Sequence, residues 1–422
     1  MSRRILSAWA CLLFAASAAQ GQLTISKDMI PTPTALAKVG LLRHWFAMIP
    51  LSGTERVSEV SVDGQYLYAQ TNQGNFHVLE AETGRWLWSA SLGRMTPKGL
   101  GASSNSFAVY VSNVNEVFAF AKANGQLLWK RRMEFSASSP TACDEERVYL
   151  GQVNGRFIVF DAKSGNLKWE ILTRGPFRSK PVPAGQVVAA AGSDGKLYVS
   201  RSDRLEVLIR WSAVGPIVAP MATSGTRTLL IASEDKSLYS VDLFKGETNW
   251  NFASGAPIDI EPLVSMENVY VVNNDGLFSR VDLKTGSPTW TISTLGGPLL
   301  AVTEKRVYLE SRDGDMFIVD RNSGQMLFDP RATYQAGLKI RDFEFGPTNR
   351  LNDRIYLGSK SGLIVCLREI DQIQPLPLRD PNQKPFGYIP PEGLLEKPNT
   401  QNIDTSLETA PGAEPAPENP EN

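Results

Sequence analysis

Short apolar runs rich in Val, Tyr and Phe recur along most of the chain, and turn-forming residues separate them. Runs such as "FIVFD" and "LYSVD" are each preceded by a second run, as in "RVYLGQVNG" and "NVYVVNNDG". Period-two apolar runs divided by Asn, Asp and Gly predict strands joined by hairpins. Each unit is therefore predicted to be a small antiparallel meander.

A second pattern sets the length of the unit. In "DLKTGSPTW", Asp282, Gly286 and Trp290 stand at intervals of four, and an aromatic residue recurs in this setting every 38 to 42 residues. That period matches a four-stranded propeller blade. We expect Gly286 to supply the positive φ of a turn and Asp282 to accept hydrogen bonds from turn amides. The aromatic positions predicted to dock neighbouring blades are Trp45, Trp88, Trp129, Trp169, Trp211, Trp250, Trp290 and Phe328.

Both ends of the repeat are needed to count the blades. Eight inner hairpins begin near Gly74, Asn115, Gly155, Gly195, Ser237, Gly276, Gly314 and Gly362. The last unit has no fourth strand of its own, but Trp45 stands 43 residues before Trp88. The predicted fold is all-β: an eight-bladed β-propeller of four-stranded antiparallel blades, closed by an N-terminal strand around Trp45. Such closure removes exposed sheet edges.

The segments "AETGRWLW", "AKSGNLKW" and "LKTGSPTW" resemble the repeat of quinoprotein-type (PQQ-like) eight-bladed propellers. The resemblance covers roughly residues 40–368 and implies that the tryptophans dock neighbouring blades. It separates the chain from WD40 propellers, because no tryptophan here is followed by aspartate.

Two branches of that family differ in function. One is similar to pyrroloquinoline quinone dependent alcohol dehydrogenases, which use calcium, a catalytic aspartate and typically a disulfide between adjacent cysteines. The other contains the non-enzymatic B component of the outer-membrane β-barrel assembly machinery. Cys143 and Cys366 are far apart, and the units are about 40 residues long with no long insertion predicted. The sequence therefore favours the non-enzymatic branch, without quinone or calcium.

Charged residues on the predicted innermost strands are the remaining candidates for a site in the channel. Strand alternation would place the two members of each pair on one face, as a hard cation would require. The acidic pairs are Asp259 with Glu261 and Asp342 with Glu344, and the basic pair is Arg178 with Lys180. Because both signs occur, a hydrated wall of ion pairs is favoured over a metal or ligand site.

The remaining candidate residues show no pattern typical of a catalytic or metal site. His44 and His77 belong to no metal-spaced or nucleophile set, and we expect both to be structural. The sequence has no phosphate loop or nucleophile elbow. Trp86 lies outside the aromatic series, and it is expected either to cover its blade or to form part of a contact surface.

The two ends define the domain organisation. Residues 1–21 combine Arg3 and Arg4, a short apolar run and small residues, as in a secretory signal peptide. Residues 22–39 form a lead-in and residues 40–370 the propeller. From residue 371 to 422 lie 11 of the 27 prolines, and the last 22 residues hold five acidic and no basic residues. This composition predicts a mobile, extended tail.

The net charge and the apolar runs limit the classes of partner that the protein is expected to bind. A net charge of −1 gives no positive field for nucleic acid, and no second apolar run is long enough to span a membrane. We predict an exported, monomeric, non-enzymatic propeller that binds an envelope protein in the periplasm or cell envelope. The alternatives are a quinone-dependent dehydrogenase or small-ligand-binding descendant, and a secreted carbohydrate-binding module.

Overall fold

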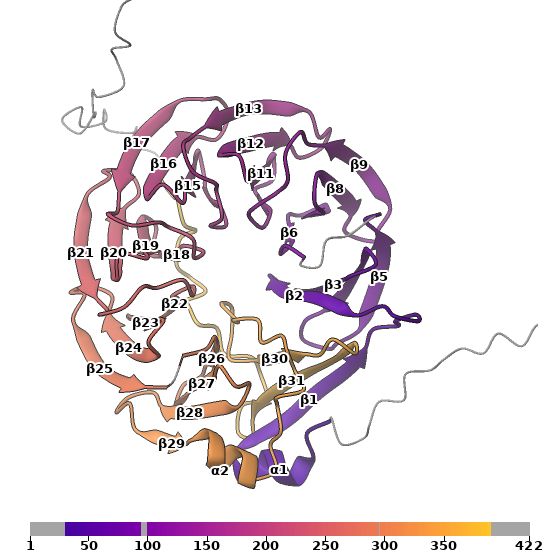
Figure 1. Ribbon diagram of the computed structural model, residues 1–422, viewed down its shortest axis with the longest axis vertical. Helices are drawn as coiled ribbons and strands as arrows, with labels where there is room; N and C mark the ends of the chain where they lie inside the picture. Colours follow the sequence, from indigo (N-terminus) through magenta and orange to yellow (C-terminus); the bar gives the residue numbers. More distant parts are fainter. Residues whose placement is uncertain (1–29, 94–98, 295, 390–422) are drawn as a thin grey trace, which may run out of the picture.

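The chain forms a ring of antiparallel sheets around a central channel (Figure 1), as described by a computed structural model for residues 30–93, 99–294 and 296–389. Blades one to seven each have four strands, which run in sequence order from the channel outward. The predicted all-β, eight-bladed propeller is confirmed. The signal peptide predicted at residues 1–21 lies outside the described residues.

The strands of the first four blades are short and evenly spaced. Blade one comprises β2 (Val57–Asp63), β3 (Tyr66–Thr71), β4 (Asn75–Glu80) and β5 (Trp86–Ser91). Blade two comprises β6 (Ser103–Ser104), β7 (Ala108–Ser112), β8 (Glu116–Ala121) and β9 (Leu127–Arg132). Blade three comprises β10 (Ala142–Cys143), β11 (Arg147–Gly151), β12 (Arg156–Asp161) and β13 (Leu167–Leu172). Blade four comprises β14 (Val182–Ala184), β15 (Val187–Ala191), β16 (Lys196–Arg201) and β17 (Val207–Ser212).

The remaining blades continue this order until the last. Blade five comprises β18 (Ala222–Ser224), β19 (Thr228–Ala232), β20 (Ser237–Asp242) and β21 (Thr248–Ala253). Blade six comprises β22 (Leu263–Ser265), β23 (Asn268–Val272), β24 (Leu277–Asp282) and β25 (Pro288–Ser293). Blade seven comprises β26 (Leu299–Val302), β27 (Arg306–Glu310), β28 (Met316–Asp320) and β29 (Met326–Phe328). Blade eight comprises β30 (Ile355–Gly358), β31 (Leu363–Glu369) and β1 (Leu41–Met48).

Blade eight closes the ring with chain from both ends. Strand β1 pairs antiparallel with β31, from Leu41 opposite Glu369 to Met48 opposite Leu363. Where a fourth, innermost strand was expected, the structure has only a single bridge between Phe345 and Gly358. Gly346 and Pro347 follow at once, and proline has no N–H to donate to a ladder. Closure by the N-terminal strand is as predicted, but the eighth blade has three strands.

A tryptophan on the outermost strand seals most seams between blades. The rings of five of these tryptophans lie on the turn glycine of the following blade, so that Trp250, for example, covers Gly286, whereas the turn that Trp169 meets has no glycine. In six blades the indole Nε1 donates to a backbone carbonyl in that turn, at distances between 2.9 and 3.1 Å. The six residues that make this hydrogen bond are Trp45, Trp88, Trp129, Trp169, Trp250 and Trp290.

Blade four departs from the predicted series. There Ile209 pairs with Val199 in the register that places Trp88 opposite Val78 in blade one, and the Ile209 side chain covers Gly246. Trp211 is two residues further along β17 and donates instead to the Thr248 hydroxyl at 2.9 Å. Trp211 still contacts the neighbouring blade, with its ring 5.0 Å from that of Tyr239, but Ile209 and not Trp211 occupies the strand position equivalent to Trp88. Phe328 of blade seven packs partly buried beside blade eight.

In blades three, five, six and seven, the turn before the outer strand is fixed by the aspartate that ends the preceding strand. In blade three the Asp161 carboxylate accepts hydrogen bonds from the amide and the hydroxyl of Ser164, at 2.8 and 2.9 Å. These hydrogen bonds hold the pKa of Asp161 down at about 2. Asp282 accepts in the same way from Thr285, and its pKa is also lowered by the turn amides. The predicted role of the aspartate is observed.

Two alanine substitutions separate backbone strain from seam packing. A Cβ on Gly286, where φ is +72°, would lie 2.6 Å from the Trp250 ring. Gly64 has a similar φ of +60°, but nothing lies within 4 Å of its Cβ position. We expect Gly64→Ala to cost about 1 kcal/mol and Gly286→Ala about 2–4 kcal/mol in urea unfolding, because only the second must displace the tryptophan. Equal losses would contradict the seam interpretation.

An insertion not predicted from the sequence lies between blades seven and eight. Residues 329–354 contain α2 (Pro330–Gln335), and the lead-in contains α1 (Pro33–Lys38). The two helices lie together at the outer edge of the ring (Figure 1), where Leu36 and Leu338 share one buried cluster. The expectation that no blade carries a long insertion was wrong, because the aromatic spacing ends at Phe328 and does not measure this segment.

Candidate functional site

A C-terminal strap, residues 371–389, crosses one face of the ring. It runs from blade eight past β22 and β18 toward β15 (Figure 1). Leu378 is buried against blades six and seven, and Phe386 packs against the cluster shared by blades four and five. The tail was predicted to be mobile from residue 371, but these residues are packed. Residues 390–422 lie outside the described residues.

Backbone hydrogen bonds hold the strap along its length. The Leu378 amide donates to the Leu351 carbonyl and its carbonyl accepts from the Met266 amide, both at 2.9 Å. Further on, the Gly387 amide donates to the Thr226 carbonyl at 2.8 Å. Prolines between these points restrict the free chain, which lowers the entropy lost when the strap docks. The face that the strap crosses carries the turns between the first and second strands and between the third and fourth strands of the blades, and we call it the strap face.

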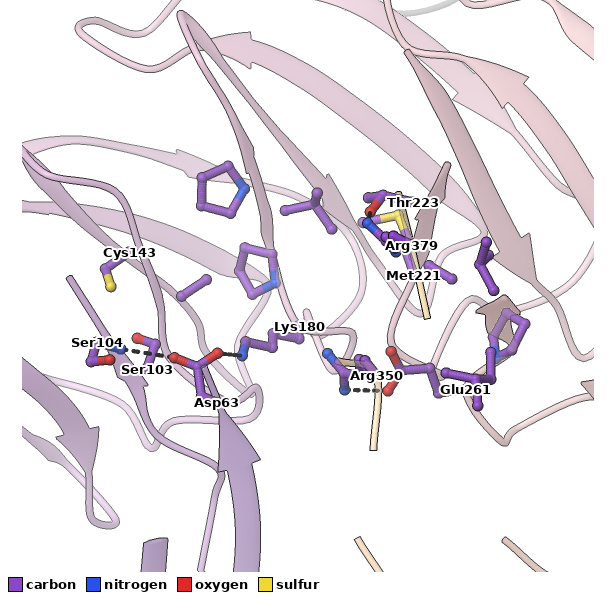
Figure 2. Close-up of a pocket in the computed structure, with 18 residues that line it drawn as sticks. Asp63, Ser103, Ser104, Cys143, Lys180, Met221, Thr223, Glu261, Arg350 and Arg379 are labelled. Carbon is purple, nitrogen blue, oxygen red and sulfur yellow. Dashed lines mark hydrogen bonds and ion pairs between the residues drawn. The ribbon is translucent and has the colours of Figure 1, made fainter. Parts of the chain in front are cut away.

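Inside the channel lies a cavity of about 220 Å³. The innermost strands of blades one to six line it, together with Arg350 from the insertion and Arg379 from the strap (Figure 2). Its wall includes apolar residues such as Met221 and Leu263. Segments distant in sequence therefore converge on one small chamber.

Two ion pairs occupy opposite ends of the chamber (Figure 2). Lys180 Nζ lies 3.5 Å from Asp63, whose other carboxylate oxygen accepts from the Ser104 amide at 3.0 Å. The Arg350 guanidinium pairs with Glu261. Burial raises the pKa of Glu261, and the nearby cations, Arg350 foremost, oppose that rise.

The six predicted channel residues do not act as three pairs. Glu261 and Lys180 line the cavity, whereas their partners Asp259 and Arg178 are exposed and do not. The prediction assumed strand alternation, but β22 begins only at Leu263 and β14 at Val182, so the preceding residues are irregular. The expected common face is therefore absent in both pairs.

The third pair lies away from the cavity. Asp342 is exposed, and Glu344 accepts from the Lys360 amide at 2.8 Å and pairs with its ammonium at 3.7 Å. Both residues belong to the insertion rather than to an innermost strand. Among the described residues, no group of three or more His, Cys, Asp or Glu side chains could hold a metal ion.

The cysteines and histidines are dispersed. Cys143 lines the chamber, and burial raises its pKa to about 12, so the thiol stays protonated. Cys366 is buried in β31. His44 Nε2 lies 3.0 Å from Glu82, whereas His77 is buried in blade one, where desolvation lowers its pKa. None of the four forms a catalytic set within the described residues.

Four exposed apolar residues of neighbouring blades lie on the opposite face, where each outer strand connects to the next blade. We call this the loop face, and the loop-face patch comprises Phe135, Val153, Leu172 and Val214, which are 36, 48, 67 and 93% exposed. All four belong to blades two to four or to the connections that follow them. Trp86 is 52% exposed on the outer rim of blade one, so it does not simply cover its blade.

Sequence reasoning missed three charged residues of the chamber. Asp63 comes from the end of β2, Arg350 from the insertion and Arg379 from the strap. The only sequence signal for any of them was Arg379, a basic residue inside the otherwise proline- and leucine-rich stretch "QPLPLRDP".

The closed ring, the turn aspartates and the tryptophan seams define an eight-bladed propeller built from PQQ-like repeats. The chain belongs to the outer membrane protein assembly factor BamB family, whose model matches residues 73–211 and 209–396. Among the described residues, no helix has the length and apolarity needed to cross a membrane.

Curated relatives carry the same family name. The chain is 23% identical over 340 residues to outer membrane protein assembly factor BamB of Burkholderia pseudomallei, covering 80% of this chain and 71% of the relative. It is 23% identical over 239 residues to BamB of Shewanella oneidensis, covering 50% of this chain and 60% of that relative.

Solved structures support the fold. The crystal structure of BamB from Moraxella catarrhalis superposes with a TM-score of 0.64 at 15% identity, covering 79% of this chain and 99% of that chain. The computationally designed Ika8 protein superposes with a TM-score of 0.59 at 16% identity, covering 74% of this chain and 96% of that one. Likeness at this identity concerns the fold alone.

Proposed function

We propose that the protein is a non-enzymatic scaffold of the cell envelope that binds another protein during outer membrane protein assembly. The observation that carries the proposal is the family match over both halves of the propeller. Curated relatives are named for that process. We further propose that residues 1–21 direct export and that the protein works as a monomer in the periplasm, peripheral to the outer membrane.

We infer that the partner binds the loop face. Connections on a rigid frame commonly carry binding residues. The loop-face patch places four exposed apolar side chains on neighbouring blades, and Val214 is 93% exposed. Apolar side chains left in water at one place favour a protein contact that buries them. The strap covers part of the opposite face, which leaves less of that face free.

Photo-crosslinking from one blade tests this proposal. Val214 and Leu205 flank the two ends of β17, so they lie on the loop face and the strap face respectively. A photo-crosslinking residue at position 214 should capture one dominant envelope protein in living cells, identified by mass spectrometry. The same residue at position 205, where Leu205 is 51% exposed, should capture it at least five-fold less. Capture from 205 alone, or from neither position, would contradict the proposal.

The quinone-dependent dehydrogenase remains the alternative from the sequence. No observation on the described residues favours it, and family membership supports a non-enzymatic role. Dye-linked alcohol oxidation after addition of pyrroloquinoline quinone and calcium would reverse this choice.

A further inference from the structure

Among the described residues that line the chamber, Arg379 is the one cation that no carboxylate pairs with directly. It reaches into the channel from the strap, and its Nη1 donates to the Thr223 hydroxyl at 2.9 Å. Its Nε is buried without a hydrogen-bond partner. A buried guanidinium N–H that lacks an acceptor is costly, so an acceptor is expected there.

The charges of the chamber do not balance. Among the residues that line it, Lys180 is matched by Asp63 and Arg350 by Glu261, which leaves the positive charge of Arg379 in excess. Burial lowers the pKa of Arg379 and neighbouring Arg350 lowers it further, while the Glu261 carboxylate raises it. An excess cation in a partly desolvated chamber attracts a small anion.

A second orphaned atom belongs to Glu261, which also lines the chamber, and it has the opposite requirement. Oε2 of Glu261 pairs with Arg350, while its Oε1 is buried and accepts from no donor among the described residues. The chamber thus lacks an acceptor at Arg379 and a donor at Glu261. Its volume of about 220 Å³ is below the roughly 300–1,000 Å³ of pockets for drug-sized ligands, so the chamber has room only for a small ligand.

We propose that the channel chamber binds a small oxyanion that also carries a hydroxyl, such as a 2-hydroxycarboxylate or hydrogen phosphate. The oxyanion accepts from the Arg379 guanidinium, and the hydroxyl donates to Oε1 of Glu261. This inference goes beyond the scaffold function and does not depend on it. Because Arg379 belongs to the strap, the bound anion also strengthens strap docking, and by linkage a docked strap strengthens anion binding.

Matched pairs of anions test the proposal by isothermal titration calorimetry on the full mature chain at constant ionic strength. Malate and succinate differ by one hydroxyl, and hydrogen phosphate differs from sulfate in the same respect. Malate or phosphate should give a saturable isotherm, with its hydroxyl-free counterpart bound at least ten-fold more weakly. Equal affinity within each pair, or no saturable binding of either hydroxyl-bearing anion, would overturn the assignment.

Substitution locates the binding. Arg379→Gln should weaken binding of malate or phosphate at least ten-fold, while Arg379→Lys should retain part of it. Arg331→Gln, a matched change of an exposed arginine on α2, should leave binding unchanged. Melting temperatures of all three variants establish that each is folded. Unchanged binding in a folded Arg379→Gln protein would overturn the proposal.

Hydrogen–deuterium exchange tests the coupling to the strap. Saturating malate should slow exchange of the Leu378 and Gly387 amides, both of which donate to backbone carbonyls outside the strap. Succinate at the same concentration should have little effect. Identical slowing by both anions would mark a general ionic effect and count against the site.

Discussion

A chain that begins at residue 49, and so lacks β1, is expected to lose its cooperative unfolding transition and to aggregate. Seven residue pairs join β1 to β31, and Trp45 covers Gly84 of blade one while donating to the Ala81 carbonyl at 3.1 Å. Removing β1 exposes the β31 edge, whose apolar residues are buried. Because a domain has only about 5–15 kcal/mol of net stability, losing a blade seam and a strand should consume most of it.

The truncation can be checked by urea unfolding followed by circular dichroism and tryptophan fluorescence. A peptide of residues 30–48 added in trans should restore part of the transition, because the strand is not required to be covalently joined. Phe46→Ala, which changes a side chain that is 49% exposed on the same strand, should cost less than about 1 kcal/mol. A truncated chain as stable as the parent would show that β1 does not close the ring.

Arg354→Leu is the point substitution with the largest expected loss of stability, about 3–5 kcal/mol. Arg354 is fully buried where blade eight meets blade one. Its Nη2 donates to Glu82 of blade one at 2.9 Å and to the Ile373 carbonyl of the strap at 2.7 Å. Its Nη1 lies 3.5 Å from Asp353. Leucine would leave the buried Asp353 carboxylate and the strap carbonyl without this partner.

Arg85→Leu is the matched control for that loss. Arg85 pairs with Glu80 at 3.3 Å at the end of the same blade-one turn, but its side chain is 68% exposed. Exposed ion pairs contribute little, so its loss should cost less than about 0.5 kcal/mol. Chemical denaturation measures both changes. If Arg354→Leu lowers stability by no more than Arg85→Leu, the buried pairing does not hold the closure.

The repeated parts of the fold could be predicted because they are made by local rules. Asp282 fixes its own turn, Gly286 supplies a backbone angle, and Trp290 covers the next turn glycine, so each function is visible in a few adjacent residues. The closing strand could be predicted because Trp45 continued the same series. Trp211 was placed at the same strand position as the other aromatics because residue types were matched without strand pairing. Ile209 occupies that position instead and covers the turn glycine.

The chamber could not be predicted because its residues share no local rule. Glu261 and Lys180 were named from strand alternation, but that alternation does not extend into the irregular residues before β22 and β14. Arg379 reaches the chamber only because Leu378 is buried beside it, in a stretch whose composition predicts an unpacked tail. Average composition cannot show that Leu378 and Phe386 pack against the blades.

The pairing of β1 with β31 also constrains the order in which parts of the propeller fold. Leu41 lies opposite Glu369, so the first strand to emerge from the membrane during export can pair only after more than 300 further residues have followed. Until then the first strand has no neighbour, and blade one has an open flank. Contacts this far apart in sequence form late and leave intermediates prone to association. The ring can therefore finish folding only when its last blade has arrived, so a chaperone that shields the unpaired first strand would act on the newly exported chain and not on the finished propeller.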